Sequence, residues 1–255
     1  FVDSFRPSLL PSPHIQGSRV AAHVGSIYLI RHGQASFGAE DYDVLSSLGE
    51  RQSILLGSHL AQTGLRLERA VSGSLTRQAH TARLVLAQLE EAPELQTDAA
   101  FNEFDAEGVI RALLPALLPH EPQALDVMRN AAHNRAEFQR LFVRLLDTWV
   151  GGDYDAPALQ SWQAFLDQVN GGLQRLLEQA QGRERIAVFT SGGTITALIH
   201  LLTGMPVASA FAMNWQIVNT SLSCLKFQGE RVTLASFNSH AHLQLLNTPS
   251  LITYR

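Results

Sequence analysis

Short apolar runs that read as strands alternate with helical segments in this chain of 255 residues. Residues 26–30, 69–73 and 185–190 are rich in apolar and β-favouring side chains, whereas residues 46–64 and 75–89 carry apolar side chains at helical spacing. Strands that alternate with helices in this way form parallel sheets covered by helices. We therefore predict an α/β fold with three layers, α/β/α, around a mainly parallel central sheet.

Three further strands complete the predicted sheet. Residues 94–97 read as an edge strand, and residues 221–227 and 232–237 read as a hairpin that turns around Gly229. A hairpin is antiparallel, so it would add to the sheet without replacing its parallel part.

The segment from residue 107 to about residue 180 is mostly helical in pattern. Apolar side chains form one long stripe over residues 127–149, too wide for an isolated surface helix, and a second over residues 161–179 that would pack against it. Residues 107–155 therefore look like a helical cap inserted into one domain, which we expect to span residues 26–255.

Residues 1–25 differ in composition from the rest of the chain. Pro7, Pro11 and Pro13 break any helix there, and no basic stretch precedes an apolar one as it would in a signal peptide. We expect an extended or disordered arm, or a leader. No apolar run approaches the ~20 residues that span a bilayer.

Composition limits the partners of the protein. A formal net charge of -4 gives no general attraction to nucleic acid or to an anionic membrane, so affinity for phosphate has to be local. A single cysteine, Cys224, excludes an internal disulfide and suits a reducing compartment, and we predict a cytoplasmic protein. The charged fraction of 16% is well below the usual ~25%, which makes a homodimer plausible.

Polar residues follow the first strand directly: Arg31, His32 and Gly33. In open α/β sheets, ligands bind beyond the carboxyl ends of the strands. A neutral imidazole is a good nucleophile toward phosphorus, and a guanidinium group offers a rigid fork of donors to phosphate oxygens. Gly33 allows a sharp turn beneath a phosphoryl group. The alternative is a surface Arg-His pair without a ligand.

A glycine-rich turn follows the strand at residues 185–190. Ser191, Gly192 and Gly193 lead into a helix predicted at residues 195–202. Such a turn presents backbone N–H groups and the positive end of the helix dipole, which together form a ready site for an anion.

These segments resemble the histidine phosphatase superfamily, in its phosphoglycerate-mutase-like branch. The resemblance rests on four segments in the family's order: residues 29–33, 72–82, 101–105 and 189–195. It implies a phosphomonoesterase in which His32 attacks phosphorus, Arg31 and Arg77 hold the phosphoryl oxygens, and Glu103 protonates the leaving group. It implies a small phosphorylated substrate, or phosphate, and no cofactor or metal, since the arginines supply the charge.

Two of these residues carry expectations of their own. Arg77 lies in the first turn of a helix, where the dipole disfavours a cation, so an anion should lie nearby unless Arg77 is merely solvated. Of the two nearby carboxylates, Glu103 and Asp105, we expect only one to face the site. An acid at position 103 needs a raised pKa, through burial against groups such as Phe101 and Phe104; Asp105 is the reserve candidate or a helix cap.

Ser191 stands where most of the superfamily has a second histidine. Three interpretations stay open: Ser191 and the helix N-terminus suffice, with reduced activity; His240 or His242 replaces the lost group; or the site binds phosphate without turnover. Mutase-type phosphoryl transfer is a further alternative. Our predicted phosphate-binding residues are Arg31, Arg77, Ser191, Gly192 and His242. In the family pattern, His242 reads better as a structural or rim histidine, and with His240 it could form only half of a metal site.

Ser191 also raises the question of a serine hydrolase. The nucleophile elbow of that class has a glycine where Phe189 stands, and an acid must follow the serine and precede the histidine. Glu230, inside the predicted hairpin, is the one carboxylate in that interval. This alternative is therefore remote.

Overall fold

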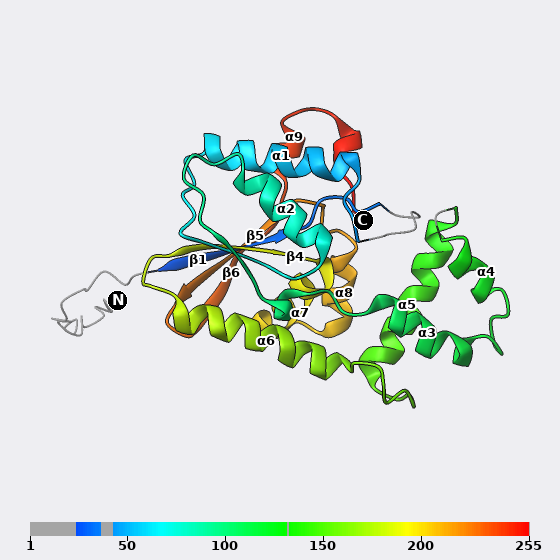
Figure 1. Ribbon diagram of the computed structural model, residues 1–255. Helices are drawn as coiled ribbons and strands as arrows, with labels where there is room; N and C mark the ends of the chain where they lie inside the picture. The colour runs from blue at the N-terminus through cyan, green and yellow to red at the C-terminus, as the bar shows by residue number, and fades with distance from the viewer. Residues whose placement is uncertain (1–23, 37–42, 132, 255) are drawn as a thin grey trace, which may run out of the picture.

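The computed structural model describes residues 24–36, 43–131 and 133–254 (Figure 1). The predicted N-terminal arm lies almost wholly outside the described residues. Within those residues, no helix combines the length and the apolarity that crossing a membrane requires.

A six-stranded sheet forms the centre of the molecule, in the order β3-β2-β4-β1-β5-β6. The strands are β1 (Gly25–Arg31), β2 (Arg69–Ser72), β3 (Leu95–Thr97), β4 (Arg185–Thr190), β5 (Leu222–Gln228) and β6 (Arg231–Ser239). The first four pair in parallel, and β5 and β6 are antiparallel. The predicted mainly parallel sheet is therefore confirmed, including the edge position of β3 and the hairpin turn at Gly229, whose φ is +57°.

Helices cover both faces of the sheet (Figure 1). One face packs on α1 (Ser47–Gln62) and α2 (Thr76–Leu86); the other packs on α6 (Trp162–Gln179) and α7 (Gly192–Thr203). Consecutive residues of a strand point to opposite faces of the sheet. Leu29 of β1 therefore packs on the α6 side, and Ile30 packs on the α1 side. The three predicted layers are thus present. α8 (Val207–Asn214) and the short α9 (Ala241–Gln244), which the sequence pattern did not reveal, follow α7 and β6.

Three helices occupy the predicted cap segment: α3 (Ala106–Leu117), α4 (Ala124–Arg129) and α5 (Arg135–Gly151). The prediction of one continuous stripe over residues 127–149 is wrong, because α4 ends before α5 begins. The Asn134 side chain accepts a hydrogen bond from the Glu137 N–H (3.4 Å) and starts the new helix. That this segment caps the site, within a single domain, stays a prediction.

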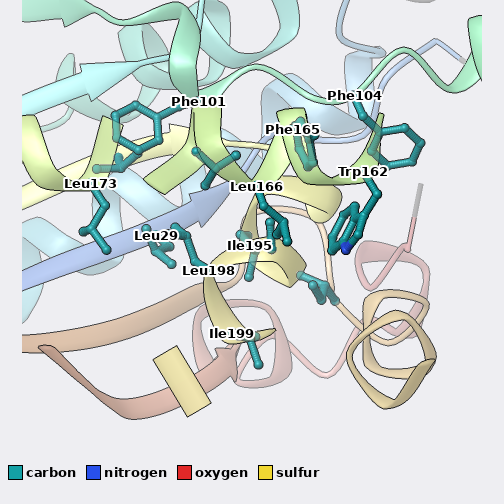
Figure 2. Packing of buried hydrophobic residues seen from close by; sticks show 14 of the residues in the cluster. Leu29, Phe101, Phe104, Trp162, Phe165, Leu166, Leu173, Ile195, Leu198 and Ile199 are labelled. Carbon is teal, nitrogen blue, oxygen red and sulfur yellow. The ribbon is translucent and has the colours of Figure 1, made fainter. Parts of the chain in front are cut away.

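Aromatic side chains join this helical segment to the sheet. Phe104 stacks on Trp149 of α5, with ring centroids 4.8 Å apart, and meets Phe165 of α6 edge-on at 5.7 Å. Figure 2 shows Phe104, Phe165 and Trp162 gathered at one end of the core, next to the leucines and isoleucines of β1, α6 and α7. The chain segment that carries Glu103 is therefore anchored on the core by its neighbour Phe104.

Candidate active site

His32 follows β1 directly, at the carboxyl end of the parallel strands. The backbone N–H of His32 donates to the Thr190 carbonyl (2.9 Å), and its backbone carbonyl accepts from the Asn219 side chain (3.0 Å). A Cβ at Gly33 would lie 2.4 Å from the Gly49 carbonyl oxygen of α1, so only glycine fits there. These contacts fix the backbone on both sides of the imidazole, which is 3% exposed.

The imidazole of His32 is held in one tautomer. Nδ1 lies 2.7 Å from the carbonyl oxygen of Gly33, and a carbonyl only accepts, so Nδ1 carries the hydrogen and Nε2 carries the lone pair. Burial, together with the charges of Arg77 and Arg31, holds the pKa of His32 well below its usual value. At neutral pH the ring is therefore uncharged, with a nucleophilic Nε2.

Arg77 meets this nitrogen from the first turn of α2. Its Nε donates to Nε2 of His32 (3.3 Å), and a terminal nitrogen donates to Asp43 Oδ1 (2.7 Å). Asp43 also accepts from the Thr76 N–H (2.8 Å) at the start of the same helix. The anion expected beside this cation is therefore confirmed as Asp43, which offsets the unfavourable dipole and fixes the guanidinium.

Arg31 is the last residue of β1 and lies near the start of α7. Its guanidinium donates to the Ile217 carbonyl, and its Cζ would lie 3.9 Å from a Cβ placed at Gly192. The charges of Arg31 and Arg77 both lower the pKa values of His32 and Glu103, which places the two guanidinium groups near both residues. The structure therefore brings the two predicted arginines together around the imidazole.

Glu103 is held by backbone donors. Its Oε2 accepts from the Gly193 N–H (3.0 Å) and its Oε1 from the Phe104 N–H (3.2 Å). Burial raises the pKa of Glu103 against the opposing influence of these donors and of both arginines, in the direction that the sequence analysis expects. Asp105 instead caps α3 by accepting from the Gly108 N–H (2.7 Å), so the two carboxylates have separate places.

Ser191 and Gly192 lie where β4 meets α7, beside this group. Ser191 is fully buried, and its Oγ accepts from Nε2 of Gln78 (2.8 Å). A Cβ at Gly192 would lie 2.6 Å from Oδ1 of Asn214, so the Asn214 amide rests on the α7 N-terminus. Sequence reasoning missed both amides. The one signal for Gln78 was its place next to Arg77, and Asn214 had none, since its element was not predicted.

His242 lies in a different environment. Its Nε2 is 3.0 Å from Oγ1 of Thr220, and its ring centroid is 5.9 Å from that of His59 on α1. Burial, with smaller contributions from His59 and His240, lowers the pKa of His242 to about 3. A neutral His242 lacks the charge that a substitute for a second catalytic histidine would bring, and these contacts give its predicted role in phosphate binding no support. Among the described residues, no group of three or more His, Cys, Asp or Glu side chains is placed to hold a metal ion.

Solved structures with the same fold include enzymes of phosphate metabolism. A phosphoglycerate mutase from Bacillus anthracis str. Sterne superposes with a TM-score of 0.61 at 18% identity, over 89% of this chain and 98% of that one. Phosphoserine phosphatase from Entamoeba histolytica, in complex with 3-phosphoglyceric acid, gives 0.59 at 18% identity, over 86% and 99%. At these identities the likeness shows the fold alone.

Curated relatives match part of the chain. A 2,3-bisphosphoglycerate-dependent phosphoglycerate mutase from Rhizobium etli is 36% identical over 90 residues, which cover 32% of this chain and 42% of the relative. The mitochondrial serine/threonine-protein phosphatase Pgam5 of Drosophila melanogaster is 27% identical over 120 residues, which cover 46% and 40%. The chain thus spans less than half the length of these relatives.

A family model matches a much longer part of the chain than these relatives do. The family model of the histidine phosphatase superfamily (branch 1) matches residues 27–113 and 125–240, which include Arg31, His32, Arg77, Glu103 and Ser191. Because this match covers most of the sequence, the chain belongs to the histidine phosphatase superfamily, branch 1.

Proposed function

We propose that the protein is a phosphomonoesterase that works through a covalent phosphohistidine on His32. The observation that carries the proposal is a neutral, buried imidazole whose Nε2 faces a guanidinium group, together with a carboxyl group of raised pKa that the same two arginines influence. The first step of phosphoryl transfer from an ester requires a nucleophilic atom that carries no proton and a general acid that carries one.

In the first step, Nε2 of His32 forms a bond to phosphorus and the bond from phosphorus to the ester oxygen breaks. Glu103 gives its proton to the departing oxygen. Arg77 donates a hydrogen bond to Nε2 in the structure. As the attack begins, this hydrogen bond has to pass from Nε2 to a phosphoryl oxygen. Asp43 keeps Arg77 in place during this exchange.

In the second step, water attacks phosphorus and the P–N bond breaks. The Glu103 carboxylate takes a proton from the water, which restores the acid, and His32 returns to its neutral form. Arg31, Arg77 and the N-terminus of α7 stabilise the charge on the phosphoryl oxygens, and the proposal assigns no step to a metal ion.

Phosphate release from 4-nitrophenyl phosphate tests the proposal. We expect His32→Ala to abolish release and wild-type protein to trap phosphate on His32 in an acid-labile form. His80→Ala is the matched control, because His80 lies on α2 and is partly exposed at its surface. Release that survives His32→Ala would contradict the proposal.

Two other outcomes identify the alternatives. Phosphate that binds without any turnover indicates a binding protein. Preferential transfer to a second alcohol indicates a phosphotransferase, as the name of the Rhizobium etli relative suggests.

A further inference from the structure

The start of α2 is aligned with the ends of β1 and β4. Arg31 pairs with Thr190 in the parallel register, so the next residues, His32 and Ser191, stand side by side and point to the same face of the sheet. That face is covered by α2, where two consecutive residues meet them. Arg77 contacts His32 (3.3 Å) and Gln78 contacts Ser191 (2.8 Å).

The direction of the hydrogen bond between Gln78 and Ser191 is fixed by a third group. Nε2 of Gln78 also lies 3.0 Å from the Phe101 carbonyl, which only accepts, so the amide nitrogen and not the oxygen occupies this position. The second N–H of the amide therefore points to Oγ of Ser191. In this pair Ser191 is the acceptor, so its hydroxyl hydrogen needs a different acceptor.

The hydrogen of Ser191 has no acceptor among the described residues. Ser191 is fully buried, and its side chain does not cap α7, which is the usual role of a serine at that position. The Oε1 of Gln78 is also buried without a partner in the described part of the chain, so the amide keeps this orientation at a cost. A buried donor without an acceptor favours an anion beside it.

We propose that Gln78 is a positioning residue that makes Ser191 a hydrogen-bond donor to a phosphoryl oxygen bound at His32. The inference rests on the proposed function. Gln78 touches no substrate; it occupies a lone pair of Oγ and leaves the hydroxyl hydrogen available to a phosphoryl oxygen. Ser191 then supplies one neutral donor, and the charge comes from the two arginines.

A double-mutant cycle tests this coupling in the full chain. The variants are Ser191→Ala, Gln78→Met and the double variant, with 4-nitrophenyl phosphate as substrate and vanadate as an analogue of the transition state. We expect Ser191→Ala to lower kcat/KM by about 10²-fold, the usual effect of removing one donor to a developing charge. Gln78→Met should lower it on the order of tenfold in the wild-type background and hardly at all in the Ser191→Ala background.

Thr190→Val is the matched control for a structural role. The Thr190 hydroxyl donates to the same Phe101 carbonyl (2.7 Å) and does not contact Ser191. We expect this variant to lower Tm without any coupling to Ser191→Ala. Gln78→Met, in contrast, should weaken inhibition by vanadate more than inhibition by inorganic phosphate.

The possible failures can be told apart. Additive effects of Gln78→Met and Ser191→Ala would overturn the inference and leave the phosphatase intact. If Gln78→Met does not fold, unchanged vanadate inhibition of Ser191→Ala, which removes one oxygen atom, would overturn it equally. Phosphate release that does not depend on His32 would instead overturn the proposed function itself.

Discussion

Acidification should destabilise the fold through His242. The pKa of this residue is lowered from 6.5 to about 3, chiefly by burial. Above pH 6.5 the folded and unfolded states are both neutral at this position, and below it the unfolded chain gains a proton that the folded protein excludes. Stability is therefore fully present above pH 6.5 and is lost as the pH falls toward 3.

The size of the effect follows from the shift. One excluded proton costs about 1.4 kcal/mol of unfolding free energy per pH unit, so His242 alone should cost about 2 kcal/mol between pH 6.5 and pH 5. Urea unfolding at a series of pH values measures this quantity. His242→Gln keeps a donor within reach of Oγ1 of Thr220 but does not titrate, so the unfolding free energy of this variant should fall less steeply below pH 6.5.

Comparison with the wild type isolates His242, because the buried His32 titrates in the same direction in both proteins. Parallel curves for wild type and His242→Gln would refute the reasoning, because they would show that the folded protein takes up the proton as readily as the unfolded chain.

Three further predictions concern Glu103. Glu103→Gln should lower kcat/KM, which reports the phosphorylation step, by about 10²- to 10⁴-fold for an alkyl phosphate such as glycerol phosphate, and much less for 4-nitrophenyl phosphate, whose leaving group needs no proton; equal losses would contradict the acid role. Because burial raises the pKa of Glu103, wild-type activity on the alkyl phosphate should fall as the pH rises through that pKa, and the variant should lack this decline. Gly193→Ala would place a Cβ 2.0 Å from Oε1 of Glu103 and 2.7 Å from the Phe104 ring, so it should lower both Tm and alkyl phosphate hydrolysis. The control is Gly171→Ala in α6, where a Cβ meets only an Arg175 nitrogen at 3.5 Å and replacing a helical glycine gains up to about 1 kcal/mol.

The sheet and the residues at its carboxyl end could be predicted because their signals are local. The apolar run before Arg31 and His32 defines β1, and the residues after it necessarily lie at the edge of the sheet where parallel strands end. The break between α4 and α5 had a local signal too. Asn134 followed three residues later by Glu137 is typical of a helix start, but the apolar stripe ran on across it.

The partners of the site residues could not be predicted, because each contact joins segments that are distant in the sequence. Asp43 reaches Arg77 across 34 residues, and Gln78 reaches Ser191 across 113. Such contacts depend on how α2 packs over the strand ends and not on any spacing in the chain. For the same reason no sequence pattern indicated that Asn214 would lie against Gly192.

The opposite pKa shifts of His32 and Glu103 arise from one environment. The two guanidinium groups lower both pKa values, because a positive charge disfavours the imidazolium and favours the carboxylate. Burial lowers the pKa of His32 and raises that of Glu103, because it disfavours whichever form is charged. At Glu103 burial outweighs the arginines, so the pKa of each group is shifted toward the form that a base or an acid needs. A cation at position 191 would add to the effect of the arginines and draw the pKa of Glu103 down, whereas the uncharged Ser191 has no such effect. An uncharged side chain at position 191 therefore adds no positive charge to oppose the effect of burial on the pKa of Glu103.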